Sequence, residues 1–217
     1  MINTTRIVGD FDESKFKDVI SRPLFRDEAV AKAVSEIVEE VRNKGDRALI
    51  EYTKKFDGVD LSGEGLAVTG EECREATAEV SEEFLAALRT AKRNIFSFHR
   101  KKLSKSWSYS KDGIVLGQLI LPISRVGIYV PGGQAAYPST VLMNAIPPLV
   151  AGVSEIAMCV PAQKSGKINP FTLAAAAEVG VEEIYKAGGA QAIAAMAYGT
   201  ESIRRVDKIC GPGNIYV

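Results

Sequence analysis

Three glycine-bearing segments each carry one polar side chain that could contact a bound ligand. Glycine lets a backbone approach a ligand closely, and it leaves the amide groups at helix N-termini open to anions. A polar side chain beside such a backbone can add a specific hydrogen bond, a combination that suits a nucleotide. The segments are "YVPGGQ" at 129–134, "KAGGAQA" at 186–192 and "CGPGN" at 210–214, and the polar residues are Tyr129, Gln191 and Asn214.

Two interpretations of these segments stay open on pattern alone. The "PGG" segment differs from the G-x-G-x-x-G fingerprint of dinucleotide-binding proteins. Paired glycines also occur where a strand must turn sharply into a helix. The segments therefore indicate either nucleotide binding or turns whose role is structural.

The elements that must position these loops alternate between strand and helix from Arg125 onward. Four apolar strands, "RVGIYV", "EIAMCV", "EEIYKA" and "VDKIC", are separated by three helical stretches. This alternation predicts βαβ units and a parallel sheet covered on both faces. Right-handed crossovers place the strand-to-helix loops at the carboxyl edge, where open α/β sheets bind ligands. We therefore expect Tyr129, Gln191 and Asn214 to converge on one cleft.

The first part of the chain is predicted to be mostly helical. Apolar residues at helical spacing predict helices over 27–44 and 81–99, and a helix between them that is capped by Asp46 and ends near Gly58. "GLAVTG" at 65–70 predicts a short strand, and the alternation around "KDG" in 104–121 predicts a hairpin.

Other reactive side chains give weaker signals. Cys73, Cys159 and Cys210 are far apart and odd in number, which argues against a disulfide framework. Cys159 and Cys210 lie in apolar runs and are expected to be buried thiols, since a nucleophilic role would need a nearby base. His99 lies in the basic last turn of a predicted helix, where a cation suits the helix dipole.

Charge and hydropathy exclude several classes of partner. The 217 residues carry a formal net charge of +0, which gives no electrostatic reason to expect nucleic acid. No apolar run reaches the about 18 residues that a bilayer span needs. The N-terminal "MINTTRIVGDFDESK" does not have the basic start and apolar core of a signal peptide. We therefore expect a cytoplasmic protein.

Three long motifs resemble those of the histidinol dehydrogenase family. They are "RVGIYVPGGQAAYPSTVLMNAIPPLVAGV", "AGGAQAIAAMAYGTESI" and "VDKICGPGNIYV", and they occur in the family's order. The resemblance implies a zinc-dependent homodimer that oxidises L-histidinol to L-histidine through an aldehyde, reducing NAD in both steps. By the same resemblance, Tyr129, Gln191 and Asn214 match the residues of the family that contact NAD.

Members of that family are longer than this chain, which resembles their first half. The resemblance implies that the zinc ligands and the catalytic glutamate and histidine belong to the other half, so we assign no catalytic and no metal-binding residue here. The expected fold is α/β, with a helical N-terminal region and an incomplete Rossmann-like parallel sheet. Residues 1–124 would form the helical region with the hairpin, and 125–217 a truncated NAD-binding domain.

A chain that ends after "IYV" is expected to leave apolar faces uncovered, and therefore to associate or to be marginally stable. Alone it is expected to be inactive. Two alternatives stay open: a related enzyme that acts on another alcohol, and a non-catalytic nucleotide-binding fragment.

Overall fold

The computed structural model describes residues 28–63, 65–132 and 136–217. The N-terminal segment considered for a signal peptide, the predicted helix start at Asp27, and Gly133 and Gln134 of the first glycine segment lie outside these ranges.

A four-stranded parallel sheet forms the centre of the fold, in the order β5-β4-β3-β6. All five residues of β3 are buried, so this strand needs cover on both faces. The predicted strands and their parallel arrangement are confirmed. The strands are β3 (Arg125–Tyr129), β4 (Glu155–Val160), β5 (Glu183–Lys186) and β6 (Lys208–Cys210).

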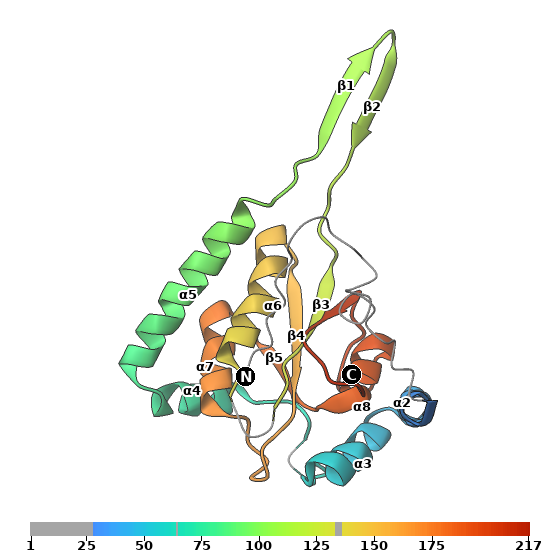
Figure 1. The fold of residues 1–217 in the computed structure, drawn as a ribbon, viewed down its shortest axis with the longest axis vertical. Coiled ribbons are helices and arrows are strands. Elements are labelled where there is room, and N and C mark those ends of the chain that lie inside the picture. Colours follow the sequence, from blue (N-terminus) through green and yellow to red (C-terminus); the bar gives the residue numbers. More distant parts are fainter. Residues whose placement is uncertain (1–27, 64, 133–135) are drawn as a thin grey trace, which may run out of the picture.

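Three helices connect the strands and cover the sheet (Figure 1). The chain steps from β3 to β4 to β5 in one direction and then returns to β6 on the other side of β3. Right-handed crossovers therefore put the last helix on the opposite face from the first two. The order of strands reverses between β3 and β6, which makes this the switch point of the sheet. The helices are α6 (Pro138–Ala151), α7 (Pro170–Val179) and α8 (Gly189–Tyr198).

Four earlier helices form an outer layer on these three. Two of them pack against α8, and the other two pack against α6 and α7. Ser81 caps the last of the four, since its Oγ accepts a hydrogen bond from the amide of Phe84 at 3.2 Å. The helices that contact α8 are α2 (Glu28–Lys44) and α3 (Asp46–Asp57), and those on the other side are α4 (Gly70–Glu79) and α5 (Glu82–Arg100).

The structure corrects two expectations for this region and adds one helix. Asp46 is the first residue of α3 and not its N-cap; its amide donates to Glu201 Oε2 at 2.7 Å, from a distant part of the chain. The predicted strand at 65–70 is reduced to a single antiparallel bridge between Ala67 and Tyr185. Helix α4 was not predicted, although Thr69 and Glu72 form a capping box at its start.

The predicted hairpin is confirmed and projects away from the body of the molecule (Figure 1). It consists of β1 (Trp107–Lys111) and β2 (Ile114–Gln118), and every residue of both strands is exposed. Asp112 and Gly113 both have positive φ, as a type I′ turn requires. Phe98, in the last turn of α5, is 63% exposed.

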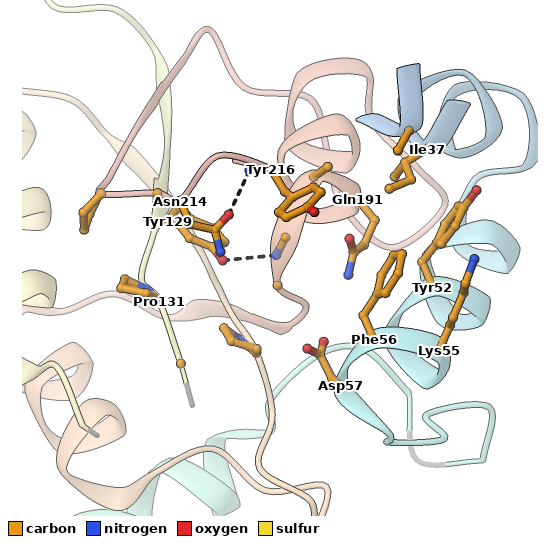
Figure 2. Close-up of a pocket in the computed structure, with 18 of the residues that line it drawn as sticks. Ile37, Tyr52, Lys55, Phe56, Asp57, Tyr129, Pro131, Gln191, Asn214 and Tyr216 are labelled. Carbon is orange, nitrogen blue, oxygen red and sulfur yellow. Dashed lines mark hydrogen bonds between the residues drawn. The ribbon is translucent and has the colours of Figure 1, made fainter. Parts of the chain in front are cut away.

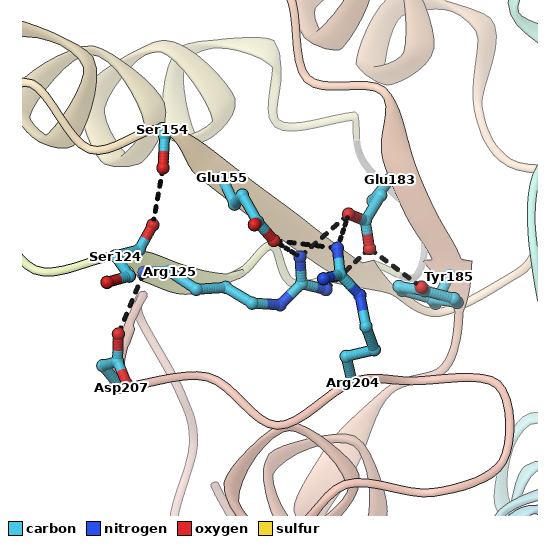
Figure 3. Close-up of polar contacts among 8 residues, drawn as sticks. All are labelled: Ser124, Arg125, Ser154, Glu155, Glu183, Tyr185, Arg204 and Asp207. Carbon is cyan, nitrogen blue, oxygen red and sulfur yellow. Dashed lines mark hydrogen bonds and ion pairs between the residues drawn. The ribbon is translucent and has the colours of Figure 1, made fainter.

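Charged side chains join the strands at the amino edge of the sheet (Figure 3). Arg125, Glu155 and Glu183 are the first residues of β3, β4 and β5. The Arg125 guanidinium donates to Glu155 at 2.7 Å and to both Glu183 oxygens at 2.8 and 2.6 Å. Arg204 donates to the same two carboxylates, each at 2.8 Å. We call these four residues the amino-edge cluster, and it lies opposite the edge where a ligand is expected.

Candidate functional site

A cleft of about 800 Å³ lies at the carboxyl edge of the sheet (Figure 2). Tyr129, Gln191 and Asn214 all line it, although they come from three separate loops. Tyr129 ends β3 and Asn214 follows β6, so the cleft opens at the switch point, where ligands bind in open α/β sheets. The predicted convergence is found, and the contact of these residues with a cofactor stays a prediction.

Tyr129 connects β3 to the start of α8. Its ring is buried, and its hydroxyl oxygen accepts a hydrogen bond from the amide of Gly189 at 3.1 Å. Burial raises the pKa of Tyr129, the Gly189 amide opposes that shift, and the charge of Asp57 adds to it. The hydroxyl is therefore protonated at neutral pH, and its proton remains free to be donated into the cleft.

Close backbone contacts fix the floor of the cleft and explain two of its glycines. A Cβ atom at Gly188 would lie 2.7 Å from Cβ of Pro161, which follows β4. A Cβ atom at Gly132 would collide with Cγ of the same proline. The loops after β3 and β5 therefore pack on Pro161 at distances that only glycine permits, and the N-terminus of α8 lines the cleft.

Gln191 and Asn214 are held in different ways. Gln191 lies in the first turn of α8, is 1% exposed and points toward the centre of the cleft (Figure 2). The Oδ1 atom of Asn214 accepts a hydrogen bond from the amide of Tyr216 at 2.9 Å, which closes an Asx turn. This bond fixes the asparagine side chain beside Tyr129 and leaves its NH₂ group as a donor.

The C-terminal end of α3 supplies another wall, which the sequence did not reveal. Tyr52 and Phe56 are stacked, with ring centroids 5.6 Å apart and planes at 8°, and the Lys55 ammonium lies over both rings. Next to them, Asp57 directs its carboxyl group into the cleft (Figure 2). Its Oδ2 atom is buried without a hydrogen-bond partner in the described structure, and burial raises its pKa.

The remaining reactive side chains lie outside the cleft. Cys159 is fully buried in β4, and this burial raises its pKa to about 12. The group is therefore a protonated, unreactive thiol, as expected from its apolar surroundings. Cys210 is half-buried in β6, and burial raises the pKa of Cys73 in α4. His99 occupies the last turn of α5, as predicted.

Metal ligands and membrane-spanning helices are both absent from the described residues. Within 28–63, 65–132 and 136–217, no group of three or more His, Cys, Asp or Glu side chains is placed to hold a metal ion. In the same ranges, no helix has both the length and the apolar character needed to cross a bilayer.

The cleft has the features that a dinucleotide needs. The N-terminus of α8 presents backbone amides suited to a pyrophosphate, and the glycines let it approach closely. The exposed face of Phe56 can stack on a base, and polar side chains line the space between. Its volume lies within the range of cofactor pockets.

Comparison with known proteins gives one answer. The family model for histidinol dehydrogenase matches residues 20–217. The histidinol dehydrogenase of Caldanaerobacter subterraneus subsp. tengcongensis is 51% identical over 217 residues, which are 100% of this chain and 50% of that protein. That of Syntrophotalea carbinolica is 53% identical over 212 residues, or 95% of this chain and 49% of that protein.

A solved structure agrees with these relatives. The crystal structure of histidinol dehydrogenase from Elizabethkingia anophelis superposes with a TM-score of 0.88 at 41% identity, over 95% of this chain and 48% of that one. The chain thus spans about half the length of the relatives it matches. The resemblance seen in the sequence and the expected α/β fold are confirmed, and the chain belongs to the histidinol dehydrogenase family.

Proposed function

We propose that this chain forms the NAD-binding half of a histidinol dehydrogenase, which oxidises L-histidinol to L-histidine through the aldehyde. The observation that carries the proposal is the convergence of Tyr129, Gln191 and Asn214 on one cleft at the switch point of the sheet. The named relatives are all histidinol dehydrogenases, which favours histidinol over another alcohol as substrate.

Each residue of the cleft has a distinct task in this proposal. The amides at the start of α8 bind the pyrophosphate, and the Tyr129 hydroxyl, held by Gly189, donates a hydrogen bond to it. Gln191 and Asn214 offer amide groups that orient the cofactor along the sheet edge. Bound NAD supplies the hydride acceptor, and the protein supplies the position and the exclusion of water.

Zinc does not fit the described residues of this chain, which bring together no set of metal ligands. We propose that the ligands and the catalytic acid and base belong to the part of the family's chain that is absent here. The present chain is then inactive as a dehydrogenase on its own.

The assembly and location are also proposals. We propose a homodimer that acts in the cytoplasm, the expected setting of a biosynthetic oxidoreductase. We further propose that residues 125–217 form the cofactor domain and that 1–124 form the first region, whose helix α3 closes one side of the cleft.

Calorimetric titration of the purified protein with NAD tests the cofactor site. Tyr129→Phe removes the hydroxyl that contacts Gly189 and that would donate to the charged pyrophosphate. We expect NAD affinity to fall roughly ten- to a hundredfold, the usual value of one hydrogen bond to a charged group. Tyr198→Phe is the matched control, since that ring lies under Arg42 at the far end of α8. Asn214→Ala, which removes the amide group at the cleft, is a second test variant. If both Tyr129→Phe and Asn214→Ala bind NAD as tightly as the wild type, the cleft is not the NAD site.

A further inference from the structure

Asp57 is the one described residue of the cleft wall that has a buried carboxyl oxygen without a partner. The Oδ2 atom is shielded from solvent and accepts no hydrogen bond within the described structure. Burial alone raises the pKa of this carboxyl, because nothing compensates for the water it has lost. An unpartnered buried acceptor in a cleft is a site that a ligand with hydrogen-bond donors would satisfy.

Two lysines of α3 lie close to Asp57 in the sequence, and only one of them lines the cleft. Lys54 forms an ion pair with Asp60 at 2.6 Å, and the Lys55 ammonium lies 5.2 Å from the centroid of the Phe56 ring. Glu36 also lines the cleft, so its described lining carries two carboxylates against the one ammonium group of Lys55. This end of the cleft therefore favours neutral donors, such as hydroxyl groups, and disfavours a further anion.

The neighbours of Asp57 identify which hydroxyl groups these are. Phe56, directly before it, is 52% exposed and stacked on Tyr52, so its ring offers a face for a base. The amides of α8, suited to the pyrophosphate, lie on the other side, where Gln191 points toward the same space (Figure 2). Between a base and a pyrophosphate a dinucleotide has a ribose.

We propose that Asp57 accepts hydrogen bonds from the 2′- and 3′-hydroxyl groups of the adenosine ribose and makes the cleft select NAD over NADP. The 2′-phosphate of NADP would remove one donor and place an anion against the carboxylate. This inference rests on the proposed function of the cleft, and it assigns the cofactor preference to one side chain of α3.

Three affinities test this assignment: those for NAD, for NADP and for 2′-deoxy-NAD, the analogue that lacks the 2′-hydroxyl of the adenosine ribose. Each is measured by calorimetry on the purified protein. The wild type should bind NAD roughly ten- to a hundredfold more tightly than 2′-deoxy-NAD, as for a hydrogen bond to a charged acceptor. This comparison needs no variant. The Asp57→Ala variant should bind NAD and 2′-deoxy-NAD equally tightly. The Asp57→Asn variant keeps the shape of the side chain but not its charge, and its ratio of NAD to NADP affinity should fall about tenfold or more.

Asp60→Asn is the matched control. This carboxylate is three residues away, exposed and paired with Lys54, and it does not line the cleft. Its substitution should leave all three affinities unchanged. Thermal unfolding of each variant separates a lost contact from a lost fold. Because Asp57→Asn does not change the volume of the side chain, this variant should unfold at nearly the same temperature as the wild type.

The possible outcomes separate this inference from the proposed function. If NAD binds and depends on Tyr129 but the wild type does not distinguish NAD from its 2′-deoxy analogue, the role of Asp57 is wrong and the cofactor site stands. An unchanged NAD to NADP ratio in Asp57→Asn leads to the same conclusion. If the wild type binds no dinucleotide, both are wrong.

Discussion

Replacing Arg125 by methionine should destabilise the fold far more than the same change at Arg204. Both guanidinium groups donate to Glu155 and Glu183, so the two substitutions remove the same kind of partner. Their surroundings differ, because the Arg125 side chain is 7% exposed and that of Arg204 is 64% exposed. Methionine keeps the apolar stem in each case and removes the charge.

The size of the stability loss depends on how well water and Arg204 can compensate Glu155 and Glu183 for the lost Arg125 charge. Removing one partner of a buried ion pair costs about 3–5 kcal/mol when the other is left without compensation. Glu155 and Glu183 are 40% and 33% exposed and would keep Arg204, so we expect about 2–3 kcal/mol for Arg125→Met. For an exposed pair, Arg204→Met should cost less than about 1 kcal/mol. At about 2–4 °C per kcal/mol, Arg125→Met should lower Tm by about 4–12 °C.

The difference in unfolding free energy between the wild type and Arg125→Met should fall as the pH is lowered. The hydrogen bonds from Arg125 lower the pKa of Glu183 to about 2 in the folded protein, against an ordinary value of 4.5. A carboxyl whose pKa is depressed by folding stabilises the fold above its unfolded pKa, and this stability is lost as pH falls toward the folded pKa. The gap between wild type and Arg125→Met should therefore be full above about pH 5 and close toward pH 2.

Urea unfolding followed by circular dichroism, at several pH values, measures both effects. Equal losses of unfolding free energy for Arg125→Met and Arg204→Met would contradict the argument from burial. A gap that widens as pH falls would contradict the sign of the Glu183 contribution. If Arg125→Met is as stable as the wild type, the ion pairs of the amino-edge cluster contribute no more free energy than the desolvation of their charges costs.

Three further predictions concern the cleft floor, the hairpin and the metal. Gly188→Ala places a methyl group against Pro161, so it should cost about 1–3 kcal/mol of unfolding free energy in urea, whereas Gly63→Ala, with open space around it, should cost little. The 217-residue chain should associate in solution, and Val115→Lys, at an exposed position of the hairpin, should shift the mass seen by light scattering toward the monomer. Metal analysis of the purified chain should find less than one tightly held zinc, and a stoichiometric zinc would mean that ligands were missed.

Local signals in the sequence predicted most of the elements. Alternating apolar strands and helices predicted the parallel sheet, and "KDG" predicted the turn at Asp112 and Gly113. Helix α4 was missed because it buries only Ala76 among its residues, which leaves no apolar stripe, although the Thr69 capping box was readable. Phe98 follows the helical period of α5 but is exposed, because periodicity alone does not tell which part of an apolar stripe another element covers.

Contacts between distant segments could not be predicted in the same way. The loops with Tyr129, Gln191 and Asn214 were placed correctly because parallel strands share one carboxyl edge. Asp57 reaches the same cleft only through the packing of α3 on α8, which no periodicity encodes. The amide of Asp46 finds its acceptor 155 residues away, at Glu201, where no local capping rule could locate it.

The placement of α3 at one wall of the cleft would couple its docking on α8 to the binding of the proposed cofactor. Asp46 at the start of α3 is held by Glu201 and Ser202, while Phe56 and Asp57 at its other end face the cleft. On the proposed function, a bound dinucleotide would join α3 to α8, and α3 would not detach until the ligand had left. Each tenfold excess of ligand over its Kd then adds about 1.4 kcal/mol to the cost of detachment. The cofactor concentration around the protein would thereby set the fraction of molecules in which α3 is docked on α8.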